Sequence, residues 1–219
     1  MTHKIEISAE LNEYFSDTST AAAVDFIAGA SKKTWSDLSV NEFVDADFKE
    51  YKTSEYVNYS NAWIYTKKVQ KDYFDFMGHI WKLTWGNSLQ GKFSDLIIPV
   101  SFHDIETVFK KKSWVREINV RNRKAKNSDP IKKLWVYCED IEDDNPGRYF
   151  RILFTFGEDE TYDLKGLKAP SDQWEKHPEG DDHYFRLDWK LQIKNNEIHL
   201  PDIKNEMLAA EKLLQKNCF

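Results

Sequence analysis

The chain has 219 residues, a formal net charge of −6 at pH 7 and a hydrophobic fraction of 41%. Eight glycines and six prolines are few, whereas eight Trp, fourteen Phe and ten Tyr supply large side chains for a core. This composition excludes an intrinsically disordered chain. The length fits one domain, so we expect residues 1–219 to form a single domain, with a helical part at about 1–88 and a sheet-rich part at about 95–219.

The cysteine content and the hydropathy pattern predict where the protein resides. Cys138 and Cys218 give neither a disulfide framework nor the spacing of a metal site. The first residues, MTHKIEIS, lack the apolar run of a signal peptide. No uncharged apolar stretch approaches the ~20 residues of a membrane span. We therefore expect a reduced, cytoplasmic protein that does not enter a membrane.

The first 90 residues are expected to be helical. Residues 21–30 predict a short apolar helix, and Ser39 with Glu42 has the spacing of a capping box. Ser60 is expected to cap the longest helix, which would run for about six turns to Gly86. Apolar residues recur along this helix at steps of three and four positions; they include Val69, Tyr73, Phe76, Met77, Ile80 and Trp81.

Strands and turns are expected after residue 95. Residues 96–100 predict a strand, and Ser101 is placed to cap a short helix that ends near Phe109. Residues 135–137 and 150–156 predict two further strands. Asn145-Pro146-Gly147 lies between them and is typical of a turn, so these strands are expected to form a hairpin.

The clearest strand pattern covers residues 184–193. Its apolar and polar residues alternate, which places one set on a buried face and the other on a face that is wet or lines a site. Asn195-Asn196 then predicts a tight hairpin, and Pro201-Asp202 precedes a final helix. The order predicts an α+β fold, with an N-terminal helical region, a mostly antiparallel sheet and a C-terminal helix.

Residues 110–133, the basic segment, contain ten Lys or Arg and two acids. The segment carries +8, and the rest of the chain therefore carries −14. Cationic side chains neutralise phosphates and an aromatic ring stacks on a base, so we expect a patch that contacts nucleic acid or another phosphate-bearing ligand. The candidate binding residues are Trp114, Arg116, Asn119, Arg121, Arg123, Lys124 and Lys126.

A second interpretation pairs the basic segment with acids of the same chain. Residues 138–163 carry nine acids and two arginines, and opposite charges on neighbouring strands stabilise a sheet.

The tryptophans are expected in two different environments, the core and the surface. We expect Trp63, Trp81, Trp85 and Trp189 in the core, and Trp35, Trp114 and Trp174 to be exposed at an interface.

Two Asp-x-Lys triplets suggest an enzymatic alternative. Residues i and i+2 of a strand share a face, so a carboxylate and an ammonium spaced in this way can hold a metal and a reacting water. The same local geometry occurs in metal-dependent nucleases. On this hypothesis Asp163 and Asp188 bind Mg²⁺, and these two residues together with Lys190 are catalytic. The sequence leaves open whether the protein is an enzyme, and Mg²⁺ follows only from this alternative.

Two acidic features complete the analysis. The stretch HPEGDDH, residues 177–183, contains five metal-ligand side chains, but its spacing fits no defined site, so we expect a solvated turn before the strand at residues 184–193. Residues 139–144 and 158–163 would form an acidic face that covers a basic site on another protein. The third hypothesis is therefore an inhibitor or immunity-type protein.

Overall fold

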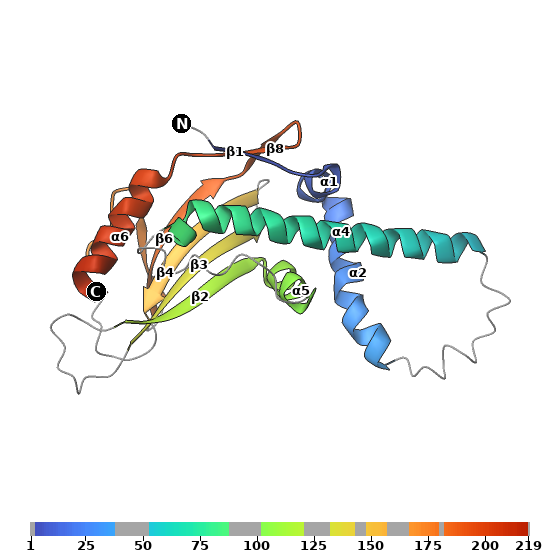
Figure 1. Ribbon diagram of the computed structural model, residues 1–219, viewed down its shortest axis with the longest axis horizontal. Helices are drawn as coiled ribbons and strands as arrows, with labels where there is room; N and C mark the ends of the chain where they lie inside the picture. Colours follow the sequence, from blue (N-terminus) through green and yellow to red (C-terminus); the bar gives the residue numbers. More distant parts are fainter. Residues whose placement is uncertain are drawn as a thin grey trace.

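A computed structural model describes seven ranges of the chain, which are residues 3–37, 53–87, 102–120, 132–142, 148–156, 167–179 and 182–218 (Figure 1). Helices come from both ends of the chain, and all strand pairs are antiparallel. The predicted α+β fold is confirmed.

The helices are α1 (Ala9–Ser16), α2 (Thr18–Asp37), α4 (Thr53–Leu83), α5 (Phe102–Lys111) and α6 (Lys204–Cys218), with a 3₁₀ turn η1 (Trp85–Asn87) after α4. Ser8 caps α1, because its hydroxyl accepts a hydrogen bond of 3.1 Å from the Leu11 N–H. The predicted short apolar helix lies within α2, and the helix predicted to end near Phe109 corresponds to α5.

The helix α4 is longer than predicted. It begins at Thr53, so Ser60 lies inside the helix and the prediction that Ser60 is its N-cap is wrong. Its 31 residues span about 46 Å, and in Figure 1 one end lies across the sheet while the other extends past it, near α2. The helix ends as expected near Gly86, where a Cβ would lie 2.9 Å from the Trp81 carbonyl oxygen.

Five strands form the larger sheet, in the order β2-β3-β4-β6-β5. They are β2 (Ser113–Val120), β3 (Lys132–Glu142), β4 (Arg148–Phe156), β6 (Asp182–Lys190) and β5 (Glu175–Glu179). Glu142 pairs with Arg148 at the end of the β3–β4 ladder, which confirms the hairpin predicted around residues 145–147. The predicted strand at 96–100 and the capping box at Ser39 lie outside the described residues.

A second sheet has the order β1-β8-β7 and consists of β1 (His3–Glu6), β8 (Glu197–Leu200) and β7 (Gln192–Lys194). The strand β1 corrects the prediction that the chain begins with helix. Four residues are too few to show a period, and the partner β8 is almost 200 residues away. Asn195 and Asn196 have φ values of 53° and 58°, as in a two-residue type I′ turn, and the tight hairpin predicted there is confirmed.

The pattern at residues 184–193 was interpreted as one strand, and this is wrong in one respect. The chain leaves the larger sheet after Lys190 and enters the smaller sheet at Gln192, with Leu191 buried between them. The two ends of the stretch HPEGDDH belong to β5 and β6, where Glu179 pairs with Asp182, so most of it is strand. The turn predicted within it falls on residues 180–181, which lie outside the described residues.

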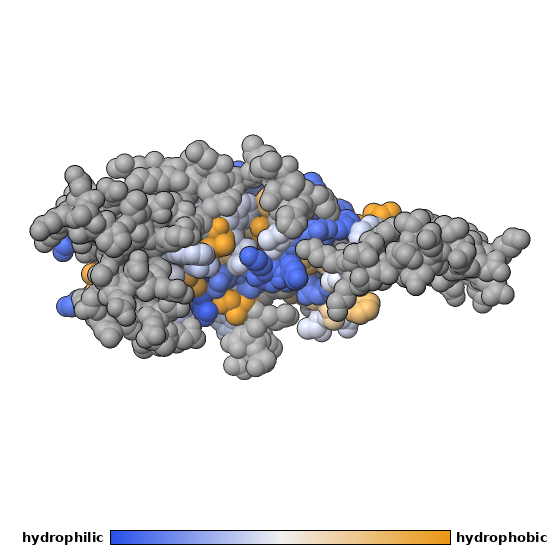
Figure 2. All heavy atoms as spheres, turned by 90° about the horizontal axis from the view of Figure 1, so that it is seen from below, coloured by the Kyte–Doolittle hydropathy of each residue, from blue (hydrophilic) through white to orange (hydrophobic). Residues whose placement is uncertain are grey.

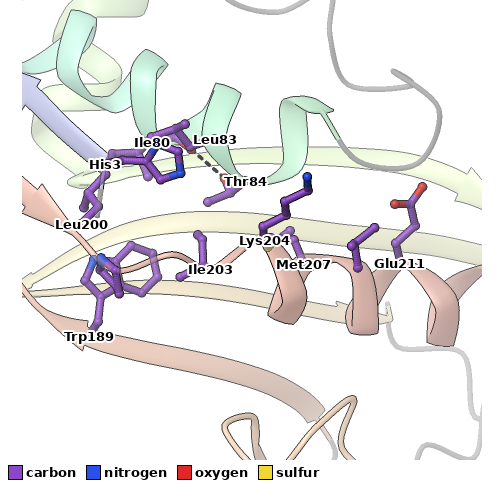
Figure 3. A pocket seen from close by; sticks show the side chains of 12 residues that line it. His3, Ile80, Leu83, Thr84, Trp189, Leu200, Ile203, Lys204, Met207 and Glu211 are labelled. Carbon is purple, nitrogen blue, oxygen red and sulfur yellow. Dashed lines mark hydrogen bonds between the residues drawn. The ribbon is translucent and has the colours of Figure 1, made fainter. Parts of the chain in front are cut away.

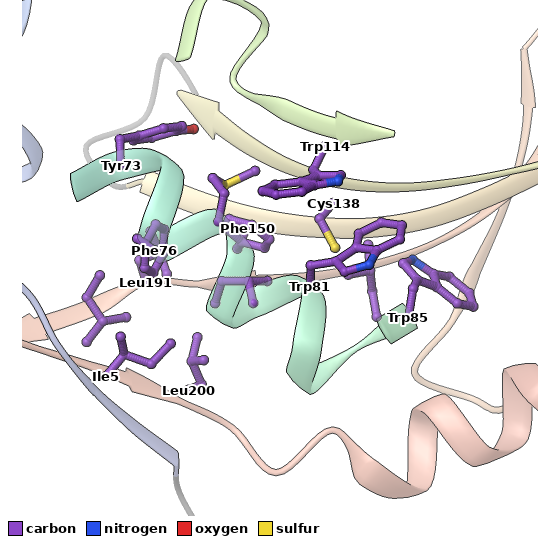
Figure 4. Close-up of a cluster of buried hydrophobic side chains, with 14 of the residues drawn as sticks. Ile5, Tyr73, Phe76, Trp81, Trp85, Trp114, Cys138, Phe150, Leu191 and Leu200 are labelled. Atoms are coloured by element: carbon purple, nitrogen blue, oxygen red, sulfur yellow. The ribbon is translucent and has the colours of Figure 1, made fainter. Parts of the chain in front are cut away.

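The core lies between α4 and the larger sheet (Figure 4). Phe76 contacts Phe150 and Trp85 contacts Phe154, with ring centroids 6.0 and 5.9 Å apart. Trp114 stacks on Trp81 with centroids 6.2 Å apart, and it is only 4% exposed. Its apolar partners come from α4, which corrects the expectation that Trp114 is exposed. Trp174, 3% exposed beside Phe154, corrects the same expectation.

Candidate functional site

The larger sheet has one face against α4 and a second face that we call the outer face. On β3, Leu134, Val136 and Cys138 are fully buried toward α4, so the residues between them project to the opposite side. Asp188 and Glu175 on this side are exposed, and most of the others are half-buried. The outer face includes Trp135, Tyr137, Glu139, Arg151, Leu153, Thr155, Tyr184, Arg186, Asp188 and Glu175.

Oppositely charged side chains lie in register across the outer face. Arg151 stands opposite Asp188, and its Nε and Nη2 donate to the two carboxylate oxygens at 2.8 Å each. Arg186 donates to Glu175 from Nε at 3.1 Å and from Nη2 at 2.8 Å, and it lies 3.9 Å from Asp188. The two arginines are thus held within the sheet by acids of neighbouring strands.

Glu139 extends the same row, because it pairs across the sheet with Arg151. Burial of this half-buried carboxyl raises its pKa, and the negative charge of Asp188 acts in the same direction. The positive charge of Arg151 opposes both effects but does not reverse them. The guanidinium of Arg151 is committed to Asp188, whose hydrogen bonds raise the arginine's own pKa.

Trp135 and Tyr137 form an aromatic pair on the outer face. Their ring centroids are 6.2 Å apart, the ring planes differ by only 16°, and both side chains are half-buried. The pair begins two residues after Lys133, the last cation of the basic segment. An aromatic surface therefore lies on the strand that leaves the basic segment.

Sequence reasoning missed this pair because both residues were interpreted only as parts of a strand. The run Trp135-Val136-Tyr137-Cys138 has no polar residue to mark a wet face. Only the position of α4 on one side of β3 distinguishes the buried residues from the half-buried ones.

The structure places the predicted binding residues as follows. Trp114 is in the core, so the prediction that it stacks on a base is wrong. Arg116 and Asn119 belong to β2, opposite Val136 and Lys133, and their side chains are outside the described part of the structure. The other four, Arg121, Arg123, Lys124 and Lys126, lie outside the described residues.

The structure describes the side chains of the first three cations of the basic segment, and these differ in their exposure and their contacts. Lys110 and Lys111 are exposed at the end of α5, in a region whose surface is largely hydrophilic (Figure 2). Lys112 forms an ion pair of 3.0 Å with Asp25 and lies 3.4 Å above the ring of Phe109. Intramolecular pairing therefore holds for Lys112, although its acid comes from α2 and not from residues 138–163.

Of the residues proposed for metal-dependent cleavage, Asp188 and Lys190 lie on the same face of β6, as their spacing predicts. Asp188 has both carboxylate oxygens bound by Arg151, so a metal would have to displace an arginine. Lys190 is exposed near the end of β6, and Asp163 lies outside the described residues. Within the described ranges, no group of three His, Cys, Asp or Glu could hold a metal ion. Asp188, as Arg151 holds it, therefore has no carboxylate oxygen free of an arginine for a Mg²⁺ ion.

Two further side chains are buried and therefore cannot react or bind a partner at the protein surface. Cys138 is fully buried against Thr84, and burial raises the pKa of its thiol to about 12, so it stays protonated at neutral pH. Asp140 is 7% exposed and accepts a hydrogen bond of 3.0 Å from the Tyr73 hydroxyl. Asp140 therefore does not contribute to the acidic face proposed for residues 139–144, while residues 158–163 are outside the described ranges.

None of the described helices has the length and apolar character needed to cross a membrane. Comparisons with known protein families, with curated proteins and with solved structures found no match to this chain.

Proposed function

We propose that the chain is a cytoplasmic protein that binds single-stranded nucleic acid. In this proposal the basic segment contacts the phosphates, and bases stack on the aromatic pair of Trp135 and Tyr137. The observation that carries it is this half-buried, nearly parallel pair on the sheet face opposite α4, directly after the basic segment in the chain.

The aromatic pair and the basic segment would contribute to the binding free energy through different interactions. Stacking of a base on an aromatic side chain contributes about 1–3 kcal/mol and tolerates any base, because every base has a π-face. Phosphate contacts release counterions, so their contribution falls as salt rises. A sheet face with aromatic side chains is also a common platform for unpaired RNA bases.

A single strand fits the outer face better than a duplex. Within a duplex the bases stack on each other and do not offer their faces to Trp135 and Tyr137. The charges of the outer face itself are largely balanced, because Arg151 and Arg186 are bound by acids. Attraction to phosphate would therefore come from the basic segment and not from Arg151 or Arg186.

The test is fluorescence anisotropy with labelled 15-nucleotide single strands and the matching duplexes. We expect Trp135→Ala and Tyr137→Ala each to weaken single-strand binding by about 5- to 150-fold, which corresponds to about 1–3 kcal/mol. Trp63→Ala is the matched control, because Trp63 is a half-buried tryptophan on α4, beside Lys67 and far from the outer face in the fold.

Salt separates the two contributions. For single strands the slope of log affinity against log salt is about −0.7 per phosphate contact. Trp135→Ala should shift this line downward without changing its slope, whereas Arg121→Ala with Arg123→Ala should make the slope shallower. The proposal fails if no oligonucleotide binds at 50 mM salt, if duplexes bind as tightly as single strands, or if Trp135→Ala changes nothing.

A further inference from the structure

A cavity of about 270 Å³ lies on the other side of the larger sheet from the aromatic pair, where α6 meets the end of α4 (Figure 3). Its walls are mostly apolar and come from α4, β6, β8 and α6. The residues that matter for the argument are Ile80, Leu83, Trp189, Leu200, Ile203 and Met207. The cavity thus brings together both sheets and helices from both halves of the chain.

The size of the cavity indicates the size of its ligand. An apolar cavity of about 150 Å³ stays dry and accepts benzene. The present cavity, at about 270 Å³, is larger, and its wall includes the adaptable side chain of Met207. A flexible aliphatic chain fits such a space better than a single rigid ring.

Charge at the rim indicates the polar end of that ligand. His3, Lys204 and Glu211 are the ionisable side chains that line the cavity. Among the described residues, none forms an ion pair with the exposed Lys204 ammonium, and the Asp202 carboxylate accepts a hydrogen bond of 3.2 Å from the Lys204 backbone N–H. Glu211 lies about 10 Å further along α6 and accepts a hydrogen bond from Gln215. The Lys204 end therefore favours an anionic group.

We propose that this cavity binds a medium-chain aliphatic carboxylate, with the chain among the apolar walls and the carboxylate at Lys204. The proposal is independent of nucleic-acid binding, because it uses the inner side of the sheet and a different set of residues. Each additional methylene that enters the cavity should raise the affinity about fourfold, until the cavity is full.

Methyl NMR of methionine provides a direct test, because the chain has only three methionines. Met207 lines the cavity, whereas Met77 is fully buried in the core and does not line it, so Met77 is an internal control. We expect hexanoate, octanoate and decanoate, kept below the concentration of micelle formation, to shift the Met207 signal saturably with rising affinity. The Met77 signal should stay constant.

Two variants test the two ends of the proposed ligand separately, the carboxylate and the aliphatic chain. Lys204→Gln should weaken octanoate severalfold and leave octanol unchanged, because only octanoate carries the charge. Leu208→Trp should block both ligands at the mouth, and it is expected to fold because Leu208 is 42% exposed. The proposal is overturned if the Met207 signal does not move at millimolar octanoate, if the Met77 signal moves equally, or if neither variant alters binding.

Discussion

Lys112 joins α5 to β2, and replacing it with methionine tests whether this junction holds the helical region on the sheet. Its ammonium forms an ion pair with Asp25, donates to the Tyr14 hydroxyl and lies over the rings of Phe109, Tyr14 and Tyr73 at 3.4, 4.9 and 5.3 Å. Methionine has the same unbranched stem as lysine and leaves the backbone at this position, with its φ of 50°, free to stay as it is, but it carries no charge.

The magnitude follows from the separate contacts. A cation over aromatic rings contributes about 1–2 kcal/mol where it is partly desolvated, and this side chain is 23% exposed. The ion pair adds about 0.5–1 kcal/mol, since Asp25 is 42% exposed, and loss of the donor to Tyr14 costs about 1 kcal/mol. Because such contributions overlap, we expect Lys112→Met to lower the free energy of unfolding by about 2–3 kcal/mol.

Urea unfolding followed by circular dichroism and by tryptophan fluorescence measures this change, and the two signals should coincide if unfolding is two-state. Lys111→Met is the matched control, because Lys111 is exposed and should change stability by less than about 0.5 kcal/mol. A Lys112→Met protein within 0.5 kcal/mol of the parent would refute the argument.

Three further predictions concern single residues. Because the pKa of Glu139 is raised in the folded protein, its protonated form is compatible with the fold below the unfolded pKa of about 4.5, and the free energy of unfolding falls as pH rises through the folded pKa. Glu139→Gln should therefore raise the melting temperature at pH 7.5 and leave it unchanged at pH 4. Equal effects at both pH values would contradict this. Gly86→Ala should destabilise the protein by about 1–3 kcal/mol, because its Cβ would meet the Trp81 carbonyl oxygen. Gly29→Ala should stabilise it by about 0.5–1 kcal/mol in the same urea assay, because Gly29 is at an exposed position of α2 with nothing within 4 Å of the added Cβ. Adding Mg²⁺ to bound oligonucleotides should give no cleavage on a gel, because an arginine already binds Asp188, and cleavage that Asp188→Ala abolishes would show the opposite.

Local patterns predicted much of the fold. The alternation at residues 184–190 places Phe185 and Leu187 in the core and Asp188 at the surface, as the structure has them. The hairpin of β3 and β4 and the asparagine pair before β8 were also predicted correctly, because both predictions depend on turn chemistry within a few residues.

Long-range contacts account for the errors. Trp114 has polar neighbours in sequence, yet Trp81 and Phe74 of α4 bury it. The pairing of β1 with β8 joins segments from opposite ends of the chain. The candidate site was missed for the same reason, since nothing local distinguishes Trp135 from the buried Val136.

The charge distribution bears on the kind of ligand that the proposed site would select. The basic segment carries +8 in a chain whose remainder carries −14, so a polyanion is attracted to one region and repelled elsewhere. On the outer face, Arg151 and Arg186 are neutralised by acids, which leaves Trp135 and Tyr137 on a nearly neutral surface. A polyanion without aromatic groups would bind only the basic segment. A neutral aromatic ligand would contact only the Trp135 and Tyr137 pair. A single-stranded nucleic acid satisfies both, because each nucleotide carries a phosphate together with an accessible aromatic face.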